Sequence, residues 1–229
     1  MNNGLFRHEF KYLITQSQVD VIKMRMSGVM KPDTHTGENG VYNICSLYFD
    51  DYYNRCYYEN LSGVDPREKY RIRIYNHDTS RISLECKRKE RGKTLKTSCI
   101  ITEDECKQLM SGNVNLCSNT SPVFMKFQNE IRLRGMRPVI VVEYERIPYV
   151  YSVGNVRVTL DTNLSSSSDI DGFLNNDMSR RPVMPAGMQL LEVKYNELLP
   201  DFIYKALQID NLTQTAFSKY FLCRKFNMR

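Results

Sequence analysis

The sequence of 229 residues has few of the features that mark secreted, membrane-spanning or metal-clustered proteins. Its three histidines argue against a histidine-rich metal centre. Its seven cysteines are an odd number without CxxC pairs, so we expect reduced cytosolic thiols and neither a disulfide framework nor a zinc site. No apolar run approaches the roughly 18 residues of a membrane span. Residues 1–9 lack the apolar core of a signal peptide, so secretion is not expected.

What is present is the composition of a globular protein with a basic surplus. Hydrophobic residues make up 41% and charged residues 25%, which excludes a disordered acidic tail or a linker-like chain. The 32 Lys and Arg exceed the 26 Asp and Glu by six, which gives a net charge of +6. The length suits one sizeable domain or two small ones, and no linker divides the chain. We therefore predict a single domain over residues 1–229.

Hydrophobic alternation with a period of two dominates the chain and predicts about eight strands. Short turns join most of them, which favours antiparallel pairing, and eight antiparallel strands favour a closed barrel. The predicted fold class is α+β, an eight-stranded antiparallel β-barrel with outer and C-terminal helices. The predicted strands are 5–14, 41–50, 68–75, 81–89, 93–101, 139–149, 156–161 and 188–195, and the predicted helices are 16–30, 51–61, one beginning at 102, 122–134, 200–208 and 215–226. We expect loops at 31–40 and 164–185.

Several strands carry charge on one face and aliphatic side chains on the other. In Tyr70-Arg71-Ile72-Arg73-Ile74 the two arginines share one face, and Leu84-Glu85-Cys86-Lys87 repeats the pattern. So do Arg157-Val158-Thr159-Leu160-Asp161 and Leu191-Glu192-Val193-Lys194. A solvated outer face explains any one of these strands, but not the recurrence of Arg and Glu in strand after strand.

The helices must cover the apolar faces, so the charged faces are expected to line the lumen of the barrel. Unpaired charges are costly to bury, so such a lumen must be wet and occupied. A lumen rich in Arg and Lys requires a polyanionic guest, and the planar fork of arginine suits phosphate. The glutamates among them indicate ligands for a hard divalent cation.

Five motifs follow one another along the chain: Arg7-His8-Glu9-Phe10-Lys11-Tyr12, Ser46-Leu47-Tyr48-Phe49-Asp50, Lys69-Tyr70-Arg71-Ile72-Arg73, Leu84-Glu85-Cys86-Lys87 and Leu191-Glu192-Val193-Lys194-Tyr195. In this order they resemble the vacuolar transporter chaperone (VTC) domain, the catalytic module of polyphosphate polymerases. That family belongs to the triphosphate tunnel metalloenzymes, with the CYTH proteins and RNA triphosphatases. The resemblance covers about residues 5–225 and implies an eight-stranded antiparallel tunnel with outer helices.

The resemblance also implies a role for each matching position. The phosphate-binding residues would be Lys11, Arg71, Arg73, Lys87, Lys96, Arg146, Arg157, Ser218 and Lys219. Of these, Arg71, Arg73, Lys87 and Arg157 would carry catalysis together with Glu192. Glu192 would bind Mn²⁺ or Mg²⁺, with Glu9 as a second metal ligand or as the group that orients a lysine.

The chain departs from the wider superfamily at two points. Arg7 stands where the first glutamate of a Glu-x-Glu-x-Lys motif is expected, which weakens a purely hydrolytic reading. A further tunnel arginine before Arg71 could be Arg67 or Arg55, and the spacing does not choose between them.

The resemblance implies a polyphosphate polymerase that transfers the γ-phosphoryl group of ATP to a growing polyphosphate chain. An inorganic or nucleoside triphosphatase and a non-catalytic polyphosphate-binding module are the alternatives. The expected partners are ATP and inorganic polyphosphate, with no nucleic acid, and a membrane protein encoded separately is compatible with the resemblance. We expect a cytoplasmic location, with membrane association only through such a partner.

Overall fold

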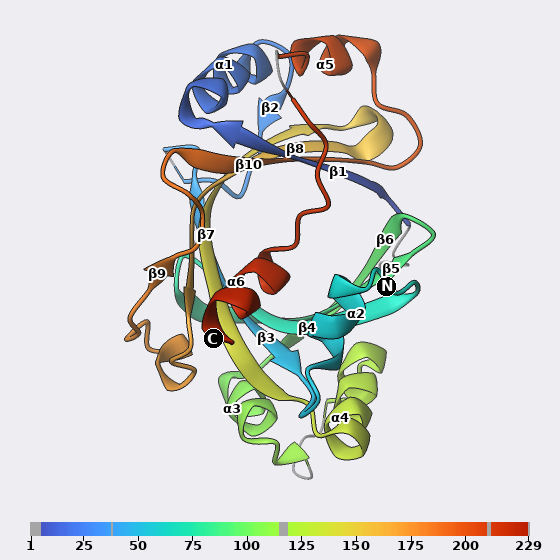
Figure 1. The fold of residues 1–229 in the computed structure, drawn as a ribbon, viewed down its shortest axis with the longest axis vertical. Coiled ribbons are helices and arrows are strands. Elements are labelled where there is room, and N and C mark those ends of the chain that lie inside the picture. The colour runs from blue at the N-terminus through green and yellow to red at the C-terminus, as the bar shows by residue number, and fades with distance from the viewer. Residues whose placement is uncertain (1–5, 38, 115–118, 210–211, 229) are drawn as a thin grey trace.

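A computed structural model describes residues 6–37, 39–114, 119–209 and 212–228, and Figure 1 shows their fold. The strands are β1 (His8–Thr15), β2 (Lys31–Pro32), β3 (Tyr42–Asp50), β4 (Arg67–Tyr75), β5 (Asp78–Glu90), β6 (Lys93–Ile101), β7 (Arg137–Tyr151), β8 (Val156–Ser167), β9 (Arg181–Pro182) and β10 (Met188–Tyr195). The helices are α1 (Gln16–Ser27), α2 (Arg55–Leu61), α3 (Glu103–Ser111), α4 (Pro122–Arg134), α5 (Asp201–Ala206) and α6 (Lys219–Asn227), with short 3₁₀ turns η2 (Val153–Asn155) and η3 (Asp171–Phe173). Leu5, the first residue of the first predicted strand, lies outside the described residues.

Eight long strands form one curled sheet in the order β1-β10-β8-β7-β3-β4-β5-β6, and every neighbouring pair is antiparallel. In Figure 1 this sheet bends into a ring, so the predicted eight-stranded antiparallel arrangement is confirmed. The two edge strands approach each other at the backbone bridge between Arg7 and Thr94, where each residue donates to the other at 3.0 Å. The short strands β2 and β9 extend the sheet beside β7 and β8.

The outer helices bury the aliphatic faces of the strands, as the alternation predicts. Helices α3 and α4 pack on β5, β6 and β7, and α1 packs on β1 and β10 beside α5 (Figure 1). Helix α4 begins where Ser121 caps the amide of Phe124 and proline occupies the first turn, and it ends at Gly135, whose φ of 63° suits glycine. Its apolar face, including Phe124 and Phe127, is fully buried in the larger of two hydrophobic clusters.

The C-terminal region differs from its prediction. We expected a helix over 215–226, but α6 begins at Lys219, where the Ser218 hydroxyl accepts from the amide of Phe221. The preceding residues are extended because they pair with β1: Gln214 bridges Tyr12, and the Thr215 amide donates to the Lys11 carbonyl at 2.9 Å. In Figure 1 this segment crosses the centre of the ring, and α6 lies inside it rather than on the outside.

Two segments that we expected to be loops contain strand. Strand β8 runs on to Ser167 because Ser165, Ser166 and Ser167 pair with β7, and all three serines are buried. Arg181–Pro182 then pairs with β8, and Lys31–Pro32 pairs with β7. Small polar residues thus continue a strand where a neighbouring strand offers partners, although their composition favours a loop.

The aromatic contacts of α4 generate a stability prediction. Phe127 is fully buried, with its ring centroid 4.8 Å from that of Phe49 and 4.7 Å from that of Tyr70. Phe127→Ala leaves a cavity that neighbouring strands cannot fill, so we expect a loss of about 3–5 kcal/mol in the free energy of unfolding, measured in urea. Leu133→Ala on the same helix is the control. Leu133 is 84% exposed, so its replacement should change stability by less than about 0.5 kcal/mol.

Candidate functional site: a basic cavity inside the ring of strands

The pairing register of strands β3, β4 and β5 places their charged and polar side chains next to one another on the inner face of the sheet. Arg71 lies between Tyr48 of β3 and Glu85 of β5, and Arg73 lies beside Ser46. The intervening Ile72 and Ile74 are fully buried in the outer hydrophobic cluster. The prediction that charge faces inward and aliphatic side chains face outward is therefore confirmed for this wall.

The inner face encloses a cavity of about 840 Å³. Among its lining residues are ten lysines and arginines and three carboxylates. The basic residues are Lys11, Arg67, Lys69, Arg71, Arg73, Lys87, Lys89, Arg146, Lys194 and Lys219, and the carboxylates are Glu9, Asp65 and Glu192. Ser218 also lines the cavity, so nine of the eleven residues that the resemblance singles out meet here. The excess of cations suits a ligand with several negative charges.

Lys96 and Arg157 are the two expected residues that do not line this cavity. The Lys96 ammonium, on a side chain that is 48% exposed, pairs with Glu85 at 3.0 Å. The Arg157 guanidinium pairs with Asp33 and donates to the Tyr42 hydroxyl at 2.8 Å. Of the two alternatives for a further tunnel arginine, Arg67 lines the cavity, whereas Arg55 pairs with Asp51 at 3.3 Å.

Buried carboxylates hold the principal arginines in place. Glu85, which is 2% exposed, lies 2.6 Å from Arg71 and 3.8 Å from Arg73. Burial alone would raise the pKa of Glu85, but Arg73, Arg71 and Lys96 hold it well below its usual range. Glu85 is therefore ionised, and it orients the Arg71 fork without neutralising the wall as a whole.

A second carboxylate, Asp161 of β8, joins Arg146 of β7 to the C-terminal helix. Asp161 accepts a bidentate pair from Arg146 at 2.6 and 2.7 Å, and Lys219 of α6 lies 2.6 Å from the same carboxylate. Burial opposes ionisation of Asp161, yet Arg146 and Lys219 lower its pKa. Tyr220 fixes the same helix from the other side, because its buried hydroxyl donates to Asp50.

Glu9 and Glu192 form the part of the cavity whose chemistry suits a divalent cation. The Lys11 ammonium lies between them, 3.1 Å from Glu9 and 3.5 Å from Glu192, so a cation already bridges the two carboxylates. Burial would raise the pKa of Glu192, but Lys194, Lys219 and Lys11 hold it well below its usual range. Two ionised carboxylates are the protein ligands that Mg²⁺ commonly takes when substrate phosphates and water complete its coordination.

Lys69, Lys89 and Lys194 belong to the cavity although they were absent from the residues expected from the sequence. Each lies two positions from an expected residue on the same strand, so both side chains point to the same face: Lys69 with Arg71, Lys89 with Lys87, and Lys194 with Glu192. This spacing could have identified the three lysines from the sequence. Within the described residues Lys69 has no carboxylate partner; it donates to Asn60 at 2.6 Å and to Ser218 at 3.3 Å. Burial, with Lys87 and Arg67 nearby, lowers the pKa of Lys69 to about 7. Burial also lowers the pKa of Lys87 to about 8, although Glu9 opposes this.

Comparison with known proteins supports the fold and identifies the family. Two solved structures share the architecture of the chain. One is a Hippeastrum protein that was proposed as an adenylyl cyclase and is described as having a dominant triphosphatase activity. It is 15% identical to this chain with a TM-score of 0.59, and the match covers 97% of this chain and 96% of the Hippeastrum chain. The other is a Bacillus halodurans protein proposed as an adenylate cyclase; it is 13% identical, has a TM-score of 0.51, and the match covers 90% and 87%.

The fold is that of the triphosphate tunnel proteins that the motifs indicated. The family model of the VTC domain matches residues 6–227, so the chain belongs to the VTC domain family. No curated protein matches the chain. Within the part of the chain that the structure describes, no helix is long and apolar enough to cross a membrane.

The lowered pKa values of Lys69 and Lys87 generate a pH prediction. A bound polyanion stabilises the protonated lysines and raises both pKa values, so binding takes up protons when the pH lies above the ligand-free values of about 7 and about 8. Affinity for tripolyphosphate should therefore be highest below about pH 7 and fall as the pH rises toward about 9.

The measurement is calorimetric titration in two buffers of different ionisation enthalpy, which counts the protons taken up. Lys69→Arg keeps the charge without titrating in this range, so it should take up fewer protons than the wild type and lose part of the pH dependence. Lys107→Arg, on an exposed site of α3, is the matched control and should behave as the wild type does. Equal proton uptake by Lys69→Arg and the wild type would contradict the assignment.

Proposed function

We propose that this protein is a polyphosphate polymerase that transfers the γ-phosphoryl group of ATP to the end of a polyphosphate chain. The observation that carries the proposal is the cavity inside the ring of strands with ten basic residues, in a chain that belongs to the VTC domain family. Its volume of about 840 Å³ falls in the range of ligand sites, and its charge fits several successive phosphates.

In this proposal Arg71, Arg73 and Lys87 bind the triphosphate of ATP from one wall. Glu85 holds the Arg71 fork in position, and Lys96 acts indirectly because it is bound to Glu85. Preorganised cations stabilise the charge that is spread over the oxygens of the transferring phosphoryl group, which is the main requirement of this reaction.

The polyphosphate acceptor would bind in the adjoining part of the cavity. Arg146, Lys219 and Ser218 line that part, and Arg157 would be a phosphate contact farther along the inner face of β8. The acceptor is a phosphate oxyanion, so no general base is needed to remove a proton from it. In agreement with this, the described residues that line the cavity include no cysteine and one histidine, His8.

Glu192 and Glu9 would hold Mn²⁺ or Mg²⁺ against the phosphates. The metal would supply charge neutralisation and would orient the phosphate oxygens. Lys11 now bridges the two carboxylates, so it is the side chain placed to move from a carboxylate to a phosphate when the substrate enters.

A triphosphatase is the second candidate, and the Hippeastrum protein of similar fold favours it. Water would then replace the phosphate acceptor in the same cavity. Arg7 makes the triphosphatase less favoured, because an arginine stands where a metal-binding glutamate is expected. Its guanidinium donates to the Asn155 carbonyl. A module that only binds polyphosphate would use the same cations without requiring Glu192.

The test is ³¹P nuclear magnetic resonance of purified protein with ATP and Mn²⁺ or Mg²⁺. The expected result is an ATP- and metal-dependent polyphosphate signal with ADP as the second product. Arg71→Ala/Arg73→Ala should lower the rate by at least about 10²-fold, because it removes charge that stabilises the transition state, and Glu192→Gln should abolish the metal-dependent polyphosphate signal.

Lys87→Ala and Arg88→Ala form a matched pair on adjacent positions of β5. Lys87 faces the cavity, whereas Arg88 pairs with Glu68 and Glu90 on the other face. Only Lys87→Ala should slow turnover. Orthophosphate as the sole product would replace the proposal with the triphosphatase, and polyphosphate binding without turnover would replace it with the binding module.

A further inference from the structure

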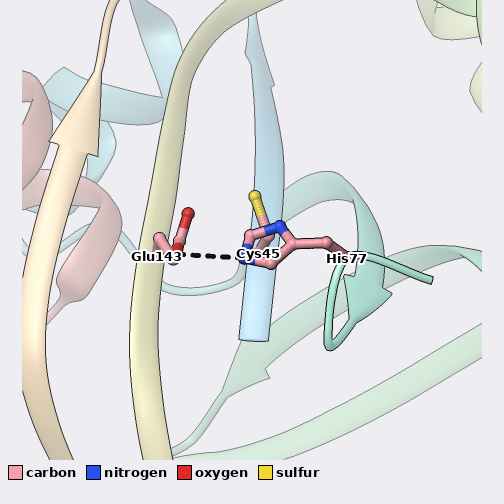
Figure 2. Close-up of side chains that lie close together, drawn as sticks. All are labelled: Cys45, His77 and Glu143. Atoms are coloured by element: carbon pink, nitrogen blue, oxygen red, sulfur yellow. Dashed lines mark ion pairs between the residues drawn. The ribbon is translucent and has the colours of Figure 1, made fainter. Parts of the chain in front are cut away.

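A second group of metal-binding side chains lies outside the cavity, on the outward face of the sheet. Cys45 of β3 and Glu143 of β7 are register partners, and His77 reaches them from the turn between β4 and β5. One donor atom from each of the three side chains lies within 4.8 Å of the other two. Figure 2 shows the thiol, the imidazole and the carboxylate converging from these three elements.

His77 has a left-handed backbone conformation. Asn76 and His77 have φ values of 51° and 55° and form a two-residue turn between the paired residues Tyr75 and Asp78. Such a turn favours glycine at its second position, because a side chain there strains the backbone. The strained backbone turns the imidazole back toward Cys45 and Glu143, which lie on β3 and β7 (Figure 2).

Two buried polar atoms in this cluster have no hydrogen-bond partner among the described residues: Nδ1 of His77 and Oδ1 of Asn43. Nε2 of His77 lies 3.3 Å from Oε1 of Glu143, and the Asn43 amide donates to the same oxygen at 2.9 Å. Nε2 is therefore the imidazole nitrogen that faces Glu143, and a cation between them would be held by Nε2, with the histidine proton on Nδ1. Oδ1 of Asn43 is a buried acceptor without a donor, which is rare and leaves it available to a cation.

Glu143 is held in a fixed orientation by a second residue. The Arg180 guanidinium donates to its Oε2 at 2.5 Å, while Oε1 faces the histidine. One carboxylate oxygen is thus positioned by a neighbour and the other is directed to the cluster, which is the usual arrangement around a metal-binding carboxylate. Cys45 is fully buried, and burial together with Glu143 raises the pKa of its thiol, so the free thiol keeps its proton.

We propose that Cys45, His77 and Glu143 form a site for Zn²⁺, distinct from the Mn²⁺ or Mg²⁺ expected in the cavity. A thiolate, an imidazole and a carboxylate are the mixed donors that Zn²⁺ accepts, whereas Mg²⁺ and Mn²⁺ prefer oxygen alone. Binding releases the Cys45 proton to solvent and forms the sulfur–zinc bond, so charge and atoms balance. The fourth position is left to water or to Oδ1 of Asn43.

The site would cross-link three elements directly behind the cavity wall. Ser46, next to Cys45, accepts from Arg73 at 3.2 Å, and Tyr144, next to Glu143, lines the cavity. The metal would therefore stiffen the strands that carry these side chains without touching the phosphates. This site is not evident from the sequence, because its three ligands come from three separate elements and not from a CxxC pair.

The test uses the reduced protein after dialysis against a chelator, titrated with Zn²⁺ and, as a spectroscopic probe, with Co²⁺. We expect one Zn²⁺ per chain, a rise in the melting temperature, and a thiolate-to-cobalt charge-transfer band with Co²⁺. Cys45→Ser and His77→Asn should each weaken Zn²⁺ binding at least about 100-fold, and Cys45→Ser should remove the band. Asparagine tolerates the positive φ, so His77→Asn keeps the metal-free fold.

Cys99→Ser, which changes a half-buried cysteine of β6, is the matched control and should bind as the wild type does. A large excess of Mg²⁺ should not displace the Zn²⁺. Absence of Zn²⁺ binding in the wild type, or wild-type binding and an unchanged cobalt band in Cys45→Ser, would overturn the proposal. Circular dichroism of each metal-free variant checks that a lost site is not a lost fold.

Discussion

The surplus of positive charge inside the ring of strands is the constraint on which the rest of the structure depends. Ten cations around one cavity repel one another, and a low-dielectric interior makes that repulsion strong. Glu85 and Asp161 relieve part of it by binding Arg71 and Arg146, while Lys69 keeps no carboxylate partner among the described residues. The aliphatic faces are turned outward as a consequence, so the outer helices are required to cover them.

The positions of most strands and the direction of most side chains could be predicted because alternation is a local property of the chain, whereas the strand order could not. The alternation in Tyr70-Arg71-Ile72-Arg73-Ile74, for example, predicts which residues share a face even when the partner strand is unknown. Segment 164–167 could not be predicted in this way, because its serines become strand only through pairing with β7. The start of α6 was misplaced for the same reason, since pairing of Gln214 and Thr215 with β1 holds residues before Lys219 in an extended conformation.

Some residues of the candidate site could be predicted from local alternation, and others could not. Strand parity and the family motifs brought together Arg71, Arg73, Lys87 and Glu192, and parity alone would have added Lys69. The partners of Lys96 and Arg157 depend on which carboxylate lies within reach of a long side chain, and Asp33 lies in a loop far from Arg157 in sequence. Such contacts depend on how the strands are arranged in the ring, so they cannot be derived from the sequence of a single strand.

The pairing of β1 with the segment before α6 bears on when the cavity is completed during synthesis. Lys11 donates to the Phe217 carbonyl, 206 positions away, and Lys219 follows two residues later. Contacts of such long separation form late, because a long loop must close before they are made. A chain emerging from the ribosome therefore carries Arg71, Arg73 and Lys87 on β4 and β5 well before Lys219 reaches the cavity. The cavity is thus complete only once α6 is seated inside the ring.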